Sequence, residues 1–324
     1  MEFALAPLIV FAARSWIQKA PSSVKAAVVF LLLALAGEQI VSHRKFAKGI
    51  LQPADLTRTI EYRASTWAEQ NLRGVRVMMP GSIGQWANAF TGLEQFSGSS
   101  WSQTANPVQQ RGLSAAYNGG ETPERDAAVS LAWLKAYGVG AVAVAGAQSE
   151  EYWKQFAHPA KFEGALPALW SAGGVTIYQV PQRTASLARV VPASDLVIRA
   201  PGGVWDTAAI ERYVAALDDP SLPLAEMQWE GRNRIRIRTA VSPGQAISVQ
   251  VSHHPGWRAV AGGHASELKR DGLGLMWLLP ACTGPCEVEL NYDGGWELRI
   301  CRWISFAAIS ALLGAVLFRF RVRV

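Results

Sequence analysis

Charged residues are scarce in this chain. Asp, Glu, Lys and Arg make up 17% of its 324 residues, whereas hydrophobic residues make up 50%. An average soluble domain carries about 25% charged residues, so this composition favours a protein that is attached to a membrane. The apolar residues do not form enough long runs for a polytopic helical bundle.

Acidic residues are scarcer than basic ones, and the excess of Lys and Arg over Asp and Glu is 31 − 25 = 6. Much of this excess lies beside apolar runs. Such placement suits phospholipid headgroups and argues against a nucleic-acid partner, which requires a basic face on a folded module. The basic residues concerned are Arg14, Lys19, Lys25, Arg44, Lys45, Lys48, Arg319, Arg321 and Arg323.

Only three cysteines occur in the chain. Cys282 and Cys286 are separated by Thr-Gly-Pro, whose turn character allows them to come together. They are a disulfide candidate in an oxidising compartment, and two unpaired thiols in a turn are the alternative. Cys301 adjoins the last apolar run. We predict no metal site, because His264 does not complete a zinc-ligand spacing.

The chain lacks a recognisable catalytic motif. Pro80–Gly84 follows a predicted strand, but it has neither the lysine of a phosphate-binding loop nor a strong helix after it, so we expect an ordinary turn. Asp218 and Asp219 precede Pro220, which is typical of a helix end. No Ser/His/Asp or Cys/His arrangement stands out by spacing. We therefore assign no catalytic or ligand-binding residue from the sequence, and we predict no cofactor.

A long apolar run, Lys25–Val41, lies near the start of the chain. We expect a helix at about 24–41, which spans about 27 Å and thus one hydrocarbon thickness. Residues 1–48 are therefore predicted to be an N-terminal membrane segment. Ala34-Leu35-Ala36 also resembles a signal-peptide cleavage site, which is the alternative. Met1–Ala13 is apolar but too short to span a bilayer alone.

A second uncharged run, Trp303–Phe318, lies near the end of the chain. It predicts a C-terminal transmembrane helix and a basic tail over residues 300–324. Two spans place the segment between them on one side of the membrane, and a disulfide prefers the oxidising side. We therefore predict a protein of the bacterial inner (plasma) membrane with extracytoplasmic central domains.

Residues 49–192 alternate helix and strand signals, which predicts a small extracytoplasmic α/β domain. Thr122-Pro123 is typical of a helix start, and Gly138 of a helix end. The stretch Ala87–Gly120 is rich in Gly, Ser, Asn and Gln, and we expect an irregular surface loop there. The expected helices and strands are Leu56–Leu72, Val75–Met79, Glu124–Tyr137, Gly140–Ala145 and Val175–Val180.

Residues 193–299 begin with one helix, expected at Trp205–Leu217, and continue as short strands. Their Pro-Gly, Gly-Gly and Asp-Gly turns indicate an extracytoplasmic β-sandwich. The fold class is therefore α+β and membrane-anchored: a small α/β layer followed by a β-sandwich, flanked by transmembrane helices. The expected strands are Arg234–Thr239, Ala246–Ser252, Trp257–Ala261, Gly274–Leu279 and Cys286–Tyr292.

Thirteen tryptophans are many for a chain of this length. Aromatic rings stack on sugars, but they also fill hydrophobic cores and lie at bilayer interfaces. Core and interface positions are favoured for most of them. Sugar binding is the only specific ligand class that the composition suggests.

The late strands carry short motifs in a characteristic order: His254-Pro255-Gly256-Trp257-Arg258, Gly262-Gly263, Asp271-Gly272-Leu273 and the strand Cys286–Tyr292. This order resembles the C-terminal end of YfhO-like bacterial membrane proteins. Upstream, Leu134–Val144 and Val175–Pro181 are similar to the α/β segment of that group. The resemblance covers roughly Asp55 to the C-terminus.

The resemblance implies a GT-C-like architecture, in which many membrane helices precede an extracytoplasmic domain and sugars are transferred from lipid carriers. The catalytic acidic residues of that family lie among its first membrane helices. This sequence has no counterpart of that part, so no family catalytic residue is carried over.

The resemblance thus implies an extracytoplasmic module of a glycosyltransferase-related protein. We expect it to be accessory or acceptor-binding in envelope glycan or lipid-linked sugar metabolism, without transferase activity of its own. Its expected partners are the lipid bilayer, a glycan or lipid-linked sugar, and a polytopic membrane protein. The alternative is a non-enzymatic envelope binding or scaffold protein.

Overall fold

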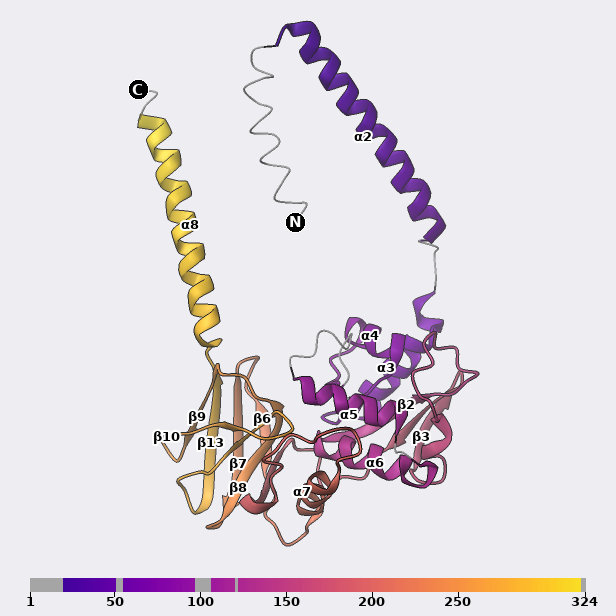
Figure 1. Ribbon diagram of the computed structural model, residues 1–324, viewed down its shortest axis with the longest axis vertical. Coiled ribbons are helices and arrows are strands. Elements are labelled where there is room, and N and C mark those ends of the chain that lie inside the picture. The colour runs from indigo at the N-terminus through magenta and orange to yellow at the C-terminus, as the bar shows by residue number, and fades with distance from the viewer. Residues whose placement is uncertain (1–19, 51–54, 97–105, 120–121, 322–324) are drawn as a thin grey trace. The chain divides into compact units, whose positions relative to one another are not determined.

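The computed structural model describes residues 20–50, 55–96, 106–119 and 122–321 (Figure 1). Its contacts divide the chain into two units, Met1–Leu56 and Thr57–Val324. The described residues form seven α-helices and three mostly antiparallel sheets, which confirms the predicted α+β class. The apolar segment Met1–Ala13 lies outside the described residues.

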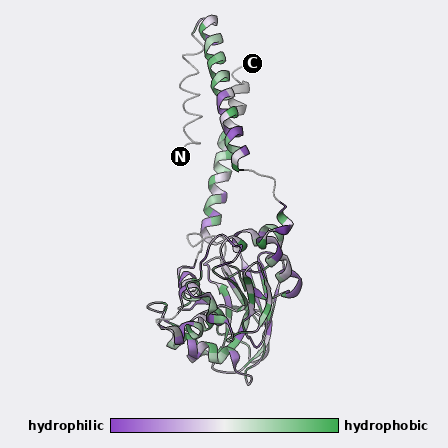
Figure 2. Ribbon diagram, turned by 90° about the vertical axis from the view of Figure 1, so that its right-hand side faces the viewer, coloured by the Kyte–Doolittle hydropathy of each residue, from purple (hydrophilic) through white to green (hydrophobic). Residues whose placement is uncertain are grey.

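The first unit contains one long helix, α2 (Ser22–Ile50), which includes the predicted helix at 24–41. Its 29 residues extend about 44 Å at 1.5 Å per residue, and none of them is buried. Among the residues that the structure describes, α2 is the one helix long and apolar enough to cross a membrane. Figure 2 shows its hydrophobic residues in green. A signal sequence near an N-terminus has the same properties, so α2 is a candidate membrane anchor or signal sequence.

The second unit begins with a four-stranded mixed sheet, here called sheet A, in the order β1-β2-β4-β3. Strand β1 is parallel to β2, and the other two pairings are antiparallel. Gly138 precedes β2 with a φ of 71°, a conformation that glycine adopts without strain. The strands are β1 (Arg76–Met78), β2 (Val139–Ala145), β3 (Ala168–Ala172) and β4 (Val175–Gln179).

Both faces of sheet A are covered. In β2, Ala141 and Ala143 belong to a core with the first two helices of the unit, whereas Val142 and Val144 belong to a core with the next helices. The alternation follows from the two-residue period of a strand. The first face carries α3 (Ile60–Asn71) and α4 (Gly81–Phe90), and the second carries α5 (Pro107–Asn118), α6 (Pro123–Ala136) and the 3₁₀ turn η3 (Pro159–Phe162).

The predicted surface loop at Ala87–Gly120 is wrong over most of its described residues. Helix α4 continues to Phe90, and α5 begins at Pro107 behind Asn106, whose side chain accepts the Val108 backbone N–H. Gly112, Ser114 and Asn118 lower the helix propensity of α5, so tertiary burial decides the outcome. Leu113, Ala116 and other α5 residues are buried in the core.

The remaining strands form two antiparallel sheets. Sheet B has the order β11-β12-β8-β5, and sheet C has the order β10-β9-β13-β7-β6. The strands of sheet B are β5 (Ala188–Pro192), β8 (Gln245–Ser252), β11 (Lys269–Arg270) and β12 (Leu275–Leu278). Those of sheet C are β6 (Glu226–Trp229), β7 (Arg234–Val241), β9 (Trp257–Ala261), β10 (His264–Ser266) and β13 (Gly284–Tyr292).

Buried residues of sheets B and C belong to one hydrophobic core, which includes Ile247 and Met276 from sheet B and Ile237 and Val288 from sheet C. The predicted alternation in β7 is confirmed, because its isoleucines are buried while its arginines lie on the other face. Alternation of this kind is typical of an antiparallel sheet with one wet face.

The other face of sheet B packs against helices. One core joins Trp133 of α6 and Tyr213 of α7 (Ala208–Asp218) to Leu275 of β12. The hydroxyl of Tyr213 lies 2.7 Å from that of Ser248 in β8. This core includes residues on both sides of the predicted boundary between 192 and 193. Short 3₁₀ turns, η1 (Leu56–Arg58) and η4 (Ala193–Asp195), complete the described elements.

Helix α8 (Gly295–Arg321) follows β13 after a two-residue turn and includes the start of the predicted helix at 303. Asp293 accepts the Gly295 backbone N–H at 2.8 Å, which satisfies a donor at the helix start. Every residue from Trp296 to Gly314 is exposed. Membrane crossing by α8 stays a prediction.

Candidate ligand-binding cleft

An open cleft of about 630 Å³ runs along strand β6, the edge strand of sheet C. We call it the β6 cleft. Its walls come from β6 and the residues before it, from the segment that leads into β5, from Arg238 of β7, from Gly74 before β1, and from Glu94, which lies beside β1 in the segment after α4. The lining residues are Gly74, Glu94, Thr184, Ala185, Ser186, Leu187, Leu224, Ala225, Glu226, Met227, Trp229 and Arg238.

The apolar wall of the β6 cleft is unusually exposed. Leu224 is 58% exposed and Trp229 is 44% exposed. Trp229 is paired in register with Ile235, which is fully buried, so both side chains lie on the same face of sheet C. Trp229 is therefore part of the core face of the sheet that remains open to solvent at its edge.

A row of rings supports Trp229 from behind. The Trp229 and Trp257 ring centroids are 6.2 Å apart, those of Trp257 and Tyr292 are 5.3 Å apart, and His254 packs edge-to-face on Tyr292 at 5.3 Å. Such contacts stabilise ring orientation beyond the effect of burial alone. Trp229 thus presents a fixed aromatic surface to the cleft.

Glu94 supplies a fixed carboxylate. Arg76 donates to one oxygen, Oε1, from Nε at 3.1 Å and from Nη2 at 2.5 Å. The Arg76 guanidinium also donates from Nη1 to the backbone carbonyls of Tyr137 at 2.7 Å and Gln250 at 2.5 Å. The Arg76 side chain is 10% exposed, whereas that of Glu94 is 40% exposed. Arg76 therefore fixes a carboxylate whose other oxygen is available to a ligand.

Hydroxyls and a charged pair complete the polar lining. Thr184 and Ser186 lie on the wall formed by the segment before β5, where the Ser186 N–H donates to Thr184 Oγ1 at 3.2 Å. Glu226 and Arg238 face each other across the β6–β7 ladder. The cleft thus combines an aromatic face with acceptors and donors of both signs. An aromatic face beside donors and acceptors can bind an uncharged polar ligand that has one apolar face.

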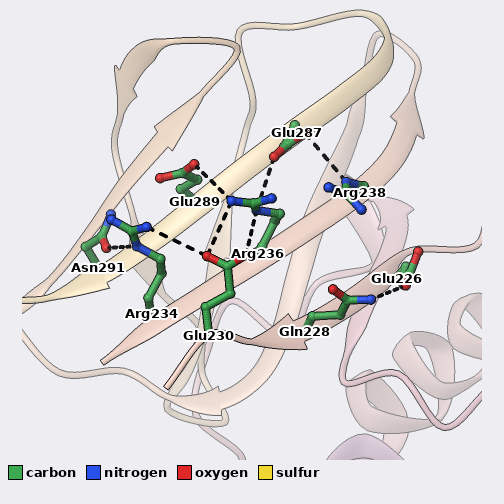
Figure 3. A network of polar contacts seen from close by, with 9 residues as sticks. All are labelled: Glu226, Gln228, Glu230, Arg234, Arg236, Arg238, Glu287, Glu289 and Asn291. Carbon is green, nitrogen blue, oxygen red and sulfur yellow. Dashed lines mark hydrogen bonds and ion pairs between the residues drawn. The ribbon is translucent and has the colours of Figure 1, made fainter. Parts of the chain in front are cut away.

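The outer face of sheet C bears a ladder of charges that is satisfied within the protein (Figure 3). Arg236 lies 3.0 Å from Glu230 and 3.3 Å from Glu287, and Arg238 lies 3.6 Å from Glu287. Arg234 donates to Asn291 at 3.0 Å. Because acidic and basic side chains alternate across neighbouring strands, we assign the ladder to stabilisation of the sheet; its Arg238 also lines the β6 cleft.

The structure joins Cys282 and Cys286 by a disulfide, with their Cα atoms 5.7 Å apart. It links the turn that leads into β13 to Cys286 within that strand. Cys286 is buried in the core shared by sheets B and C, and Cys301 on α8 is a free, exposed cysteine. Neither cysteine of the disulfide is among the residues that line the β6 cleft.

The motif His254-Pro255-Gly256-Trp257 lies where β13 ends and α8 begins. His254 Nδ1 accepts the Gly256 N–H at 3.0 Å, and the Asp293 N–H donates to the Gly256 carbonyl at 2.9 Å. A side chain at Gly256 would lie 2.7 Å from the Gly295 nitrogen. The motif thus clamps this junction, and its His254 and Trp257 also belong to the row of rings behind Trp229.

The segment Pro80–Gly84 is not the simple turn that we expected, because helix α4 begins within it at Gly81. The Ser82 N–H at this helix start donates to Glu151 at 2.8 Å, and Glu151 is fully buried. A carboxylate of the chain itself therefore occupies the place where a phosphate group would bind. Asp218, as expected, ends a helix, and it pairs with Lys135 at 2.6 Å.

Sequence reasoning missed most of the β6 cleft. The sequence singled out Trp229 only as one of thirteen tryptophans, whose number suggests sugar binding. Neither Glu94 nor its partner Arg76 belongs to a motif. The Arg76–Glu94 pair spans 18 residues, and no local periodicity predicts it. Within the residues that the structure describes, no group of three or more His, Cys, Asp or Glu side chains is placed to hold a metal ion.

No known protein family, no curated protein and no solved structure matches the chain. The functional argument therefore rests on the geometry of the described residues.

Proposed function

We propose that this chain is a membrane-anchored, extracytoplasmic glycan-binding module, accessory to a GT-C-like glycosyltransferase-related protein of the bacterial inner membrane. In this proposal α2 and α8 both cross the bilayer, and the body between them is exported. Sheets B and C pack as a β-sandwich, as the residues that share their core suggest. The polytopic partner supplies the transfer chemistry.

The observation that carries the proposal is the pairing of Trp229 with Glu94 in one open cleft. Sugars have an apolar face of C–H groups and an equatorial rim of hydroxyls. An exposed indole ring binds the first by stacking, and a carboxylate oxygen accepts hydrogen bonds from the second. The Thr184 and Ser186 hydroxyls add weaker partners that exchange readily with water.

An acceptor-binding role fits the open shape of the β6 cleft. A long glycan passes through an open groove without threading, whereas a small-molecule enzyme encloses its substrate. Weak binding by a few contacts suits a module that holds an acceptor near a separate catalyst.

The test is glycan binding by the full chain in detergent, measured on an array of bacterial envelope glycans. Trp229→Ala should weaken binding of any retained glycan by about tenfold, because it removes the stacking surface. The matched control is Trp205→Ala, since Trp205 is 40% exposed and lies outside the cleft lining. An array without a retained glycan, or equal losses for both variants, would refute the proposal.

A second candidate is a non-enzymatic scaffold that binds an extended peptide. The specific observation is that β6 is an edge strand, paired on one side with β7. An edge strand presents free backbone groups to a further strand. Retention of envelope peptides but not glycans, insensitive to Trp229→Ala, would favour this candidate.

A further inference from the structure

The start of α8 carries two cations and two large rings on one surface. Arg299, Arg302, Trp303 and Phe306 together line a hollow of about 520 Å³ on the helix. We call these four residues the α8 collar. Their spacing of three and four residues places them on one helical face, because an α-helix completes a turn in about 3.6 residues.

The rings of the collar are exposed and fix each other's orientation. Trp303 is 72% exposed and Phe306 is 65% exposed, and their ring centroids lie 6.4 Å apart in an edge-to-face arrangement. The helix continues with exposed apolar residues such as Ile309 and Leu312. A helix that is apolar on all sides requires an apolar surrounding.

The two arginines differ in their partners. Arg299 donates to Asp293 at 3.0 Å, and Asp293 lies 3.7 Å from Arg258 as well. The pKa of Asp293 is lowered by the Gly295 N–H and then by these two arginines, so it stays an anion. Arg302 has no hydrogen bond or ion pair to any described residue. Its guanidinium is therefore the free cation of the collar.

We propose that the α8 collar binds the phosphate of an anionic phospholipid, with Arg302 on the phosphate and Trp303 at the boundary between headgroups and acyl chains. The proposal rests on the proposed function, in which α8 enters a bilayer. To the proposed function it adds the class of lipid that binds at the start of α8.

Charge complementarity favours an anionic lipid over a zwitterionic one. A guanidinium has five N–H donors in a planar fork, which matches the oxygens of a phosphate. A zwitterionic headgroup offers the same phosphate, but its own cation competes for it. The attraction of one basic residue to an anionic surface corresponds to about a fivefold preference over a neutral one. Tryptophan at this depth is typical of the aromatic belts of membrane helices.

The experiment measures quenching of Trp303 fluorescence by brominated lipids in nanodiscs that contain the full chain. The discs hold phosphatidylcholine with a minor fraction of either brominated phosphatidylglycerol or brominated phosphatidylcholine. The contribution of Trp303 is the difference between the parent chain and Trp303→Phe. We expect brominated phosphatidylglycerol to quench Trp303 up to about fivefold more strongly than brominated phosphatidylcholine.

Variants identify the responsible cation. Arg302→Gln should bring the two quenching efficiencies together, and Arg302→Lys should keep most of the difference. The matched control is Arg212→Gln on α7, an exposed arginine far from α8 in the sequence, and it should change nothing.

The outcomes separate this inference from the proposed function. Equal quenching by both lipids in the parent chain, or a preference that survives Arg302→Gln, would overturn the lipid site while leaving α8 in the bilayer. No quenching of Trp303 by either lipid would show that α8 lies outside the bilayer and would overturn both.

Discussion

Asp271 is a buried carboxylate that controls the turn between β11 and β12. Its Oδ1 accepts the backbone N–H groups of Leu273 at 2.9 Å and Leu275 at 2.7 Å, whereas its Oδ2 is buried without a partner. Burial raises its pKa from 3.8 to about 7, although these N–H groups and Arg270 oppose the shift. An unpartnered oxygen in an apolar site is consistent with a bound proton.

This residue predicts a pH dependence of stability. Between the unfolded pKa of 3.8 and the folded pKa of about 7, the folded chain retains the proton of Asp271 and the unfolded chain releases it. Stability should therefore fall as the pH rises through this window and level off above it. Each pKa unit corresponds to about 1.4 kcal/mol, so the loss is a few kcal/mol.

Asp271→Asn removes the titrating group and keeps an oxygen that accepts from Leu273 and Leu275. The variant should lose the part of the pH slope that Asp271 causes. The measurement is the free energy of unfolding of both chains in detergent at about pH 5 and about pH 8. These two pH values enclose most of the window in which the stability of the parent chain should fall. Parallel pH profiles for the two chains would contradict the assignment.

Substitution of Gly256 should cause a steric clash at the junction of β9, β13 and α8. In Gly256→Ala the new Cβ would lie 2.7 Å from the Gly295 nitrogen and 2.8 Å from the Tyr292 ring. One of these neighbours is backbone, so the site must shift, and we expect a loss of about 1–3 kcal/mol in the free energy of unfolding.

The control for Gly256 is Gly203→Ala, because nothing lies within 4 Å of a Cβ at Gly203. That variant should stay within about 0.5 kcal/mol of the parent. A similar loss in both variants would mean that the glycine at position 256 is not specially required.

At the scale of elements, the charge ladder of sheet C depends on Arg236. This side chain of β7 contacts Glu230, Glu287 and Glu289, the last at 3.9 Å (Figure 3). Arg236→Met would leave three carboxylates facing one another across neighbouring strands. We expect a loss of about 1–2 kcal/mol, smaller at high salt, since repulsion between opposed like charges is screened.

Chemical denaturation at low and high salt measures this effect. Arg232→Met is the control, because Arg232 is exposed and has no hydrogen bond or ion pair to the described residues. If Arg236→Met were as stable as Arg232→Met at low salt, the ladder would make no net contribution to sheet C.

Helices and strands could be predicted from the sequence where the local residue pattern and the tertiary packing favour the same structure. The sequence predicts Trp257–Ala261 as a strand, and β9 has these bounds, because alternation and the flanking Pro-Gly and Gly-Gly turns agree. Helix α5 and the short strand β6 were missed. Helix α5 has weak propensity, and β6 is four residues long at a sheet edge, where neither length nor alternation is sufficient evidence.

The candidate site was less predictable than the fold. Its key pair, Arg76 and Glu94, exists because β1 brings Arg76 beside the ends of α6 and β8, as the bonds to Tyr137 and Gln250 show. Those contacts span 61 and 174 residues of sequence, respectively. A single sequence contains no signal for a contact of that range.

At the scale of the whole molecule, the proposed topology predicts an exported body between α2 and α8. Alkaline phosphatase inserted at Gly203 or Gly244 should be active, because both glycines lie in open surroundings and the enzyme requires an oxidising compartment. Green fluorescent protein at the same sites should be dark. Bright fluorescence and inactive phosphatase at both sites would reverse the topology.

The route by which the chain enters α8 has a mechanical consequence. Strand β13 is hydrogen-bonded on one side to β7 and on the other to β9, and it passes into α8 through Gly294 and Gly295. Tension applied through α8 along β13 therefore loads both ladders in shear, so that many backbone hydrogen bonds share the force at once. A strand at the sheet edge would instead open one bond at a time. The body should accordingly withstand tension applied through α8 along β13 better than pulling on the edge strand β6.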